Sequence, residues 1–281
     1  MSAATGTLFV VATPIGNLGD ATARSIETLR ECDVILAEDT RRTRQLLSHF
    51  AIAGKRVERF DAHASTHDIQ RATERLLAGE RVALVTDAGT PSVSDPGEAL
   101  VRAAIAAGAA VVPIPGASAV LAALVASGLG GEGFRFIGFL PRQGAARRDA
   151  IALVAATAEP VVLFESPARV AATLEDLAAT TPNRAVCVAR ELTKAHEEFV
   201  RGSCEELARL GREWIGEVVV VLGTHNPSDR EAAVGDDALD SRIDEAIARG
   251  EHAKAAAARL AAWSGRKRRD VYERLLTRKN R

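Results

Sequence analysis

Cysteine is scarce in this sequence of 281 residues, because only Cys32, Cys187 and Cys204 are present and they are widely spaced. An odd number of isolated cysteines provides neither a disulfide framework nor the paired spacing of a zinc site. Disulfides are also rare in reducing compartments. We therefore expect a cytoplasmic protein with no structural disulfide and no metal site.

Several motifs of common catalytic and nucleotide-binding proteins are missing as well. The chain has no G-x-x-x-x-G-K-[ST] phosphate loop and no G-x-S-x-G nucleophile elbow. His63 and His67 stand four residues apart, but no Glu-x-x-His arrangement accompanies them, so we interpret them as solvated loop residues. Residues 128–133 match G-x-G-x-x-G but follow a helical segment and precede a strand, which favours a connector over a dinucleotide site.

Long continuous apolar runs are also absent. No charged residue falls between Arg102 and Glu132, yet two glycines and two prolines interrupt that stretch between positions 108 and 116. A helix, a short buried strand and a second helix explain the stretch better than a membrane span. No basic region precedes the first apolar run of the chain, so we expect no signal peptide.

Charge is nearly balanced over the whole chain but not along it. Hydrophobic residues make up 47% and charged residues 26%, as in soluble globular proteins, and 281 residues suffice for two domains. The formal net charge is −1, but residues 241–281 carry 12 Lys and Arg against 5 Asp and Glu. Residues 1–240 carry 24 against 32. A basic tail on an acidic body predicts a nucleic-acid contact at that end.

An apolar run ends in a loop of turn-forming residues four times. The clearest case is residues 82–97, where Val-Ala-Leu-Val leads into a loop rich in Asp, Gly and Pro. The same order occurs at residues 8–16, 109–118 and 161–167. One such loop is an ordinary strand-ending turn, but ligands of open parallel sheets bind beyond the carboxyl ends of the strands. Four of them predict several strand ends that converge on one ligand.

Strand-like and helix-like segments alternate through the first 115 residues, which predicts a parallel α/β sheet. We expect a first α/β domain at residues 1–117, a second at 118–224 and a linker at 225–240. The segment 241–281 is expected to be a small basic helical module that resembles a helix-turn-helix, although a single solvated basic helix is the alternative. Ser241, with an acidic residue three positions later, predicts a capping box at the start of this module.

Two charged segments are candidates for chemistry. Residues 38–44, Glu-Asp-Thr-Arg-Arg-Thr-Arg, could combine proton transfer by the carboxylates with phosphate binding by the arginines. The alternative is a charged helix N-terminus, where acidic side chains interact favourably with the helix dipole. Residues 190–194, Arg-Glu-Leu-Thr-Lys, are either a working site or an ion-pair cluster.

Seven ordered motifs that span essentially the whole chain match a known pattern. They are residues 11–20, 31–41, 87–91, 112–119, 138–141, 164–167 and 190–194. They resemble the ribosomal RNA small subunit methyltransferase I family, which belongs to the tetrapyrrole-methylase-like, class III S-adenosylmethionine methyltransferases. The resemblance implies two α/β domains of the tetrapyrrole methylase type with S-adenosylmethionine in the cleft between them, and a homodimer.

The same resemblance implies a reaction, which is methylation of the ribose 2′-hydroxyl of one cytidine in the decoding region of small-subunit (16S) ribosomal RNA, in the assembled subunit. Two alternatives stay open. One is a methylase of a tetrapyrrole or another small molecule on the same fold, and the other is a nonenzymatic protein that binds nucleic acid through its tail. The basic tail and the arginines of residues 38–44 favour an anionic RNA over a small molecule.

Individual roles follow from the resemblance and from the chemistry of methyl transfer. The cofactor contacts are expected to come from Pro14, Asp87, Ala88, Gly89, Ser92, Pro115, Gly116, Ala117, Glu165 and Leu192. A ribose hydroxyl is a poor nucleophile, so a base should assist it, and the candidates are Glu38, Asp39 and Lys194. The RNA contacts are expected to come from Arg41, Arg44, Arg147, Arg148, Arg266, Lys267, Arg268 and Arg269.

Overall fold

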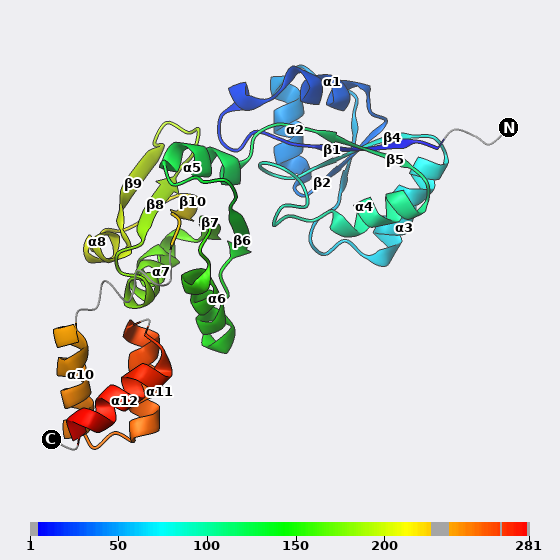
Figure 1. Ribbon diagram of the computed structural model, residues 1–281. Helices are drawn as coiled ribbons and strands as arrows, with labels where there is room; N and C mark the ends of the chain where they lie inside the picture. Colours follow the sequence, from blue (N-terminus) through cyan, green and yellow to red (C-terminus); the bar gives the residue numbers. More distant parts are fainter. Residues whose placement is uncertain (1–4, 226–235, 265, 280–281) are drawn as a thin grey trace. The chain divides into compact units, whose positions relative to one another are not determined.

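The computed structural model describes residues 5–225, 236–264 and 266–279 (Figure 1). The chain divides into two compact units. Unit 1 comprises Met1–Ala126 and Ala189–Glu198, and unit 2 comprises Ser127–Val188 and Phe199–Arg281. The sequence placed the first boundary at 117/118 and assigned residues 189–198 to the second domain, whereas the contacts place both the segment 118–126 and residues 189–198 in unit 1.

Unit 1 is built on a five-stranded sheet with the strand order β3-β2-β4-β1-β5. Its strands are β1 (Thr7–Val11), β2 (Val34–Ala37), β3 (Arg56–Arg59), β4 (Arg81–Val85) and β5 (Ala110–Ile114). Its helices are α1 (Ala23–Glu31), α2 (Thr40–His49), α3 (Thr66–Leu77), α4 (Glu98–Ala106) and α5 (Ala119–Ser127), with a short 3-10 helix η1 (Leu18–Asp20). All paired neighbours run parallel, which confirms the parallel α/β sheet expected from the sequence.

Helices cover both faces of this sheet, as parallel strands require (Figure 1). Leu29 of α1 and Leu47 of α2 belong to the core on one face, and Leu76 of α3 and Leu100 of α4 belong to the core on the other. All four residues of β2 are buried, which explains its uninterrupted apolar sequence. The helix–strand–helix reading of residues 102–132 is confirmed by α4, β5 and α5.

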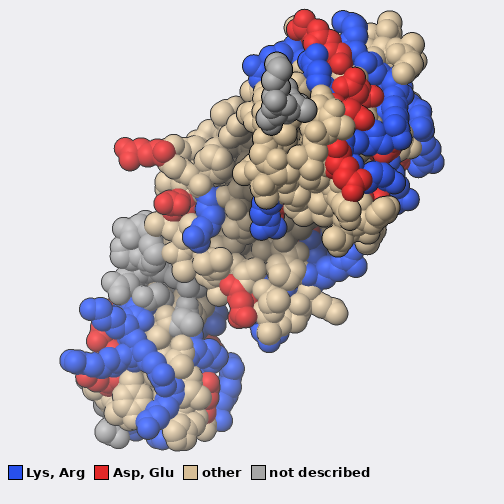
Figure 2. All heavy atoms as spheres, turned by 90° about the vertical axis from the view of Figure 1, so that its right-hand side faces the viewer, with Lys and Arg blue, Asp and Glu red and all other residues tan. Residues whose placement is uncertain are grey.

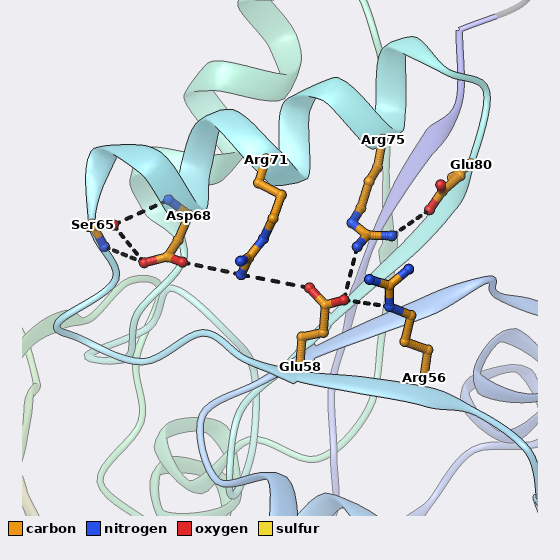
Figure 3. A network of polar contacts seen from close by, with 7 residues as sticks. All are labelled: Arg56, Glu58, Ser65, Asp68, Arg71, Arg75 and Glu80. Atoms are coloured by element: carbon orange, nitrogen blue, oxygen red, sulfur yellow. Dashed lines mark hydrogen bonds and ion pairs between the residues drawn. The ribbon is translucent and has the colours of Figure 1, made fainter.

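Ion pairs attach the polar edge strand β3 to α3 (Figure 3), in addition to its pairing with β2 and the packing of Val57 against the core. The Glu58 carboxylate accepts a hydrogen bond from Arg75 of α3 at 2.9 Å and forms ion pairs with Arg56 at 2.6 Å and with Arg71 of α3 at 3.7 Å. Arg75 also pairs with Glu80 at 3.1 Å. Since charged side chains on an edge strand oppose pairing with another chain, this network both attaches β3 to α3 and protects the edge.

Unit 2 contains a second five-stranded sheet with the order β6-β7-β10-β8-β9. Its strands are β6 (Arg135–Phe139), β7 (Val161–Glu165), β8 (Ala185–Arg190), β9 (Glu198–Ser203) and β10 (Val218–Leu222), and its helices α6 (Gly144–Ala156), α7 (Pro167–Thr180) and α8 (Cys204–Arg209). This sheet is mixed, because β7 pairs parallel with β6 and antiparallel with β10. The connector predicted at residues 128–133 is confirmed, since it lies between α5 and β6.

The C-terminal segment forms three helices around an apolar core of its own, α10 (Asp236–Ala248), α11 (Ala253–Ser264) and α12 (Arg268–Lys279). The helical module expected from the sequence is confirmed, and the alternative of a single helix is wrong. The capping box at Ser241 is wrong, because α10 begins at Asp236 and Ser241 lies inside it. Of the expected linker at 225–240, residues 226–235 lie outside the described part of the chain.

The first turn of α10 lies within the expected linker, and ion pairs with α12 stabilise it. Asp240 of α10 binds Arg274 of α12 through two hydrogen bonds of 2.6 and 3.0 Å, and Asp244 binds Arg278 in the same way at 2.8 and 2.5 Å. Asp236 lies 3.0 Å from Arg274. These pairs neutralise the acidic side of α10, so the remaining surface of the module is rich in positive charge, as Figure 2 shows at its lower left.

None of the described helices combines the length and the apolar character that a membrane crossing requires.

Candidate functional site

The loops that follow β1, β2, β4 and β5 meet at the carboxyl edge of the first sheet, because these strands are parallel neighbours. Thr13 and Gly89 exchange two backbone hydrogen bonds of 2.9 and 3.1 Å, which join the loops after β1 and β4. The Thr13 hydroxyl also donates to the Thr86 carbonyl oxygen at 3.1 Å. The structure thereby brings together one group of predicted site residues: Pro14, Glu38, Asp39, Asp87, Ala88, Gly89, Pro115, Gly116 and Ala117.

The carboxylates at this edge cross-link the loops after β2 and β4. Glu38 Oε2 accepts hydrogen bonds from the Thr86 hydroxyl at 2.7 Å and from the Asp87 backbone N–H at 3.3 Å. Asp87 Oδ1 in turn accepts from the Asp39 backbone N–H at 3.0 Å, and Asp87 Oδ2 lies 3.5 Å from Arg42. The predicted candidates Glu38 and Asp87 are therefore held in fixed positions beside each other.

Asp95 is a further acidic residue at this edge, which the sequence reasoning missed. Burial, followed by the repulsion from Glu38, raises the pKa of Asp95 to about 6, and burial also raises the pKa of Asp87. Asp95 belongs to a loop in which Ser92 and Ser94 have positive φ angles of 68° and 64°. The sequence feature that could have indicated Asp95 is the long turn-rich loop after β4, which continues to residue 97.

Asp95→Asn is expected to stabilise unit 1 at neutral pH. The carboxyl has a pKa of about 6 in the folded state against an ordinary value of 3.8, so its ionisation opposes folding above pH 6, and the penalty disappears below about pH 4, where both states are protonated. Two pKa units correspond to at most about 3 kcal/mol, and half-burial reduces the expected gain to about 1–2 kcal/mol at pH 8. Melting temperatures between pH 4 and 8 measure it.

Asp68→Asn is the matched control with the opposite sign. The hydrogen bonds from Ser65 lower the pKa of Asp68, so its contribution to stability is present above the unfolded-state pKa and is lost as the pH falls through the folded-state pKa. Asp68→Asn should therefore lower the melting temperature at pH 8, and this difference should shrink toward acidic pH. A lower melting temperature of Asp95→Asn at pH 8 would contradict the account of Asp95.

Asp39 has a structural partner that limits its use as a base. It is the N-cap of α2, where its Oδ1 accepts from the Arg41 backbone N–H at 2.7 Å, and its Oδ2 lies 3.1 Å from the Arg41 guanidinium. The hydrogen bonds from Arg41 lower the pKa of Asp39 to about 2. The helix N-terminus that was the alternative reading of residues 38–44 is thus present, together with exposed side chains of Arg41 and Arg44.

A hollow of about 510 Å³ opens next to these loops, entirely within unit 1. Its lining residues come from the loop after β1, the loop and helix after β5, and the segment 191–194: Ile15, Asp20, Thr22, Pro115, Gly116, Ala117, Ser118, Ala122 and Thr193. Pro115, Gly116 and Ala117 were predicted cofactor contacts, whereas Asp20, Thr22 and Thr193 were not. Gly116 leaves no room for a side chain, because an added Cβ would lie 3.0 Å from the Ala12 Cβ.

The segment 191–194 packs onto the loop after β1. A Cβ on Gly16 would lie 2.6 Å from Lys194 Cγ and 2.9 Å from the Leu192 carbonyl oxygen, so only glycine permits this approach. Leu192 is buried, and Lys194 Nζ lies 2.9 Å from Glu191 Oε1. This ion pair holds the Lys194 side chain within its own segment, whereas Glu38 lies at the carboxyl edge of the sheet.

The side chains of two predicted site residues of unit 2, Glu165 and Arg147, form hydrogen bonds within that unit. The Glu165 carboxylate has no exposed area and accepts hydrogen bonds from Arg169, Thr173 and the Ser166 backbone N–H. Any cofactor contact of Glu165 would therefore come from its main chain. Arg147, expected to hold RNA phosphate, is only 12% exposed and donates to Asp176 and Thr173 at 2.9 Å each.

The Arg147 guanidinium is used within the fold, which weighs against the expected contact with RNA phosphate. Its neighbour Arg148 is exposed, and it has no ion pair or hydrogen bond among the residues that the structure describes. In the C-terminal module Lys267, Arg268 and Arg269 are exposed, whereas Arg266 lies 2.6 Å from Asp236. Of the bases predicted to contact RNA, Arg41, Arg44, Arg148, Lys267, Arg268 and Arg269 are thus exposed.

Comparison with known proteins gives relatives over nearly the whole chain. Residues 7–208 match the family described as Tetrapyrrole (Corrin/Porphyrin) Methylases. The ribosomal RNA small subunit methyltransferase I of Halalkalibacterium halodurans is 44% identical over 271 residues, which is 95% of this chain and 93% of the relative. The enzyme of the same name from Synechocystis sp. is 41% identical and covers 95% of this chain and 96% of its own.

Solved structures with a similar fold are more distant in sequence. Diphthine synthase is 19% identical with a TM-score of 0.60, covering 78% of this chain and 92% of its own. Uroporphyrin-III C-methyltransferase from Thermus thermophilus in complex with S-adenosylhomocysteine is 19% identical with a TM-score of 0.55, covering 78% of this chain and 97% of its own. At this identity the likeness shows the fold, which confirms the tetrapyrrole methylase architecture expected from the sequence.

Proposed function

The chain belongs to the ribosomal RNA small subunit methyltransferase I family, and we propose that it transfers the methyl group of S-adenosylmethionine to small-subunit ribosomal RNA. The acceptor we propose is the ribose 2′-hydroxyl of one cytidine in the decoding region. The observation that carries this proposal is 44% identity over 95% of the chain to a relative of that name. The loops after β1, β2, β4 and β5 lie at one edge of unit 1, which supports a single ligand-binding centre there. Three of them are among the four strand-end loops that the sequence singled out, and the fourth of those, residues 161–167, follows β7 in unit 2.

The residues at this edge fit S-adenosylmethionine. The hollow of about 510 Å³ is in the size range of small-molecule sites, and Gly16 and Gly116 keep backbone close where side chains would fill space. Glu38, Asp87 and Asp95 give the edge a negative potential, which favours the positively charged sulfonium. When bound, the cofactor would supply an electrophilic methyl group.

The protein's part in the reaction is to align the acceptor and to remove its proton. An in-line displacement gains most of its acceleration from the fixed positions of the reacting atoms. We propose that Glu38 accepts the proton of the ribose hydroxyl, because its carboxylate lies at the convergent strand ends. Asp39 is a weaker candidate because its pKa of about 2 disfavours proton uptake.

We propose that the exposed bases of α2 and of the C-terminal module hold RNA phosphates. Reversing three charges, Lys267→Glu with Arg268→Glu and Arg269→Glu, should raise the KM for RNA by about tenfold or more and reduce the salt dependence of binding, with kcat changed less than threefold. The KM measured at several salt concentrations tests this. The matched control is Arg249→Glu, an exposed base at the end of α10, and an equal effect of both variants would contradict a specific surface at α12.

No observation favours the alternative function, a methylase of a tetrapyrrole or another small molecule. The uroporphyrin-III enzyme shares the fold at 19% identity, which says nothing of the substrate of this chain. We further propose that the protein acts in the cytoplasm, as a homodimer, and on the assembled subunit rather than on naked RNA. Transfer of labelled methyl groups to isolated small subunits and to the corresponding naked RNA, side by side, tests the substrate form, and sedimentation tests the dimer.

A further inference from the structure

The hydroxyl of Thr193 is buried and has no hydrogen-bond partner among the residues that the structure describes. A buried hydroxyl without a partner opposes folding, so such a group calls for an explanation. Thr193 also lines the hollow in unit 1, next to Thr22 and Ser118. It therefore lies where a ligand could provide the partner that the protein does not.

The backbone around Thr193 is held in an unfavourable conformation. Glu191 has a φ angle of 51° and Thr193 one of 64°, in the left-handed region that β-branched residues rarely adopt. The Glu197 carboxylate fixes this turn by accepting a hydrogen bond of 2.6 Å from the Thr193 backbone N–H. The fold thus maintains a strained residue at this position, as occurs where a side chain must be presented to a ligand.

Gly16 explains where the hydroxyl now lies. A Cβ added to Gly16 would be 2.9 Å from Thr193 Oγ1, so the hydroxyl is packed against the bare Cα of this glycine. Because it makes no hydrogen bond there, a rotation about the Cα–Cβ bond breaks none and moves the hydroxyl to the position that the methyl group or the Cβ hydrogen now occupies. Such a rotation would give the hydroxyl a different neighbour at the wall of the hollow.

We propose that Thr193 is a cofactor-binding residue whose hydroxyl turns from Gly16 toward S-adenosylmethionine bound in this hollow and forms a hydrogen bond with it. The inference rests on the proposed function, since it assumes that the hollow holds part of this cofactor. It adds to that function a contact from the segment 191–194, which reaches unit 1 from a distant part of the sequence.

Thr193→Val separates a ligand contact from a structural role. Valine is also β-branched and nearly the same size, so the strain at positive φ is retained and only the hydroxyl is removed. We expect the Kd for S-adenosylmethionine, and that for S-adenosylhomocysteine, to rise about tenfold, as for the loss of one hydrogen bond. The melting temperature of the protein without cofactor should stay the same or rise, because an unpartnered hydroxyl is lost. Thr193→Ser should bind like the wild type.

Thr73→Val is the matched control, because the Thr73 hydroxyl lies in α3 and donates to the Ile69 carbonyl oxygen at 2.8 Å. It should not change either Kd. The proposal is overturned if Thr193→Val binds both cofactors within twofold of the wild type, or if its affinity falls together with the melting temperature of the cofactor-free protein. Wild-type protein that binds neither cofactor would instead overturn the proposed function, so the two failures are distinguishable.

Discussion

Replacing Arg184 by methionine is expected to destabilise unit 2 by about 3–5 kcal/mol. The Arg184 side chain is buried and donates hydrogen bonds to the carbonyl oxygens of Gly223, Val154 and Glu159 at 2.9, 2.7 and 2.9 Å. Burial lowers the pKa of Arg184 to about 10, so the guanidinium is still charged at neutral pH, and no carboxylate of the described residues pairs with it. Methionine fills similar volume but leaves three buried carbonyls without this donor.

The position of these carbonyls explains why the effect should be large. Val154 lies near the end of α6, Glu159 precedes β7, and Gly223 follows β10, so one side chain joins three segments at one end of the second sheet. Arg184→Lys keeps a positive charge but lacks the planar fork of donors, and it should lose an intermediate amount of stability.

Urea unfolding followed by tryptophan fluorescence measures this loss. In a Trp263→Phe background Trp214, which is buried in the core of unit 2, is the sole tryptophan and reports on that unit. The matched control is Arg209→Met, whose side chain is 73% exposed and should change stability by less than about 0.5 kcal/mol. Equal unfolding midpoints for Arg184→Met and the parent would refute the structural role of Arg184.

Glu38→Gln is expected to lower the turnover of methyl transfer by about 100-fold, with the Kd for S-adenosylmethionine changed less than threefold. Glutamine keeps an oxygen that accepts from the Thr86 hydroxyl, so the loop after β4 should stay in place while the proton acceptor is lost. Asp39→Asn should keep turnover within about threefold of the wild type, because asparagine caps a helix as well as aspartate does. The sequence alone offers both residues as candidate bases without ranking them.

Single-turnover rates with saturating cofactor and subunits distinguish the two variants, because product release does not enter them. Helix content from circular dichroism should be the same for both. If Asp39→Asn loses 100-fold and Glu38→Gln retains the wild-type rate, the base is Asp39 or a group that it positions, and the assignment to Glu38 fails.

The sequence was sufficient for the architecture of unit 1 because its strands have strong local signals. The runs at 34–37 and 82–85 are buried on both faces and are apolar throughout, so their pattern is unambiguous. The strand β3 was not predicted, since its sequence Arg-Val-Glu-Arg has no apolar pattern, and its pairing with β2 and its ion pairs with the arginines of α3 are tertiary contacts. Similarly, α10 begins in the expected linker because of ion pairs with α12, which are remote in sequence.

The sequence indicates the candidate site residues that lie at strand ends. It does not indicate those that depend on tertiary contacts. The sequence named Glu38, Asp87 and Gly116 as candidates from their motifs and from the family resemblance, and they lie together because loops after parallel strands share one edge. Asp95 and Thr193 were missed, because the raised pKa of Asp95 depends on burial and on Glu38, and the exposure of Thr193 to the hollow depends on Gly16. The sequence predicted an RNA contact for Arg147, and no feature of the neighbouring sequence shows that Asp176 and Thr173 accept hydrogen bonds from its guanidinium.

The most direct test of the proposed function is to map the methylated atom. Small ribosomal subunits that lack the modification would be incubated with labelled S-adenosylmethionine and the protein, and their RNA cleaved with alkali, which spares a linkage next to a 2′-O-methyl group. The account predicts one protected linkage, at a cytidine of the decoding region, that is lost with Glu38→Gln and kept with Asp39→Asn. Transfer of the label to a base, or no transfer to RNA by protein that binds the cofactor, would contradict it.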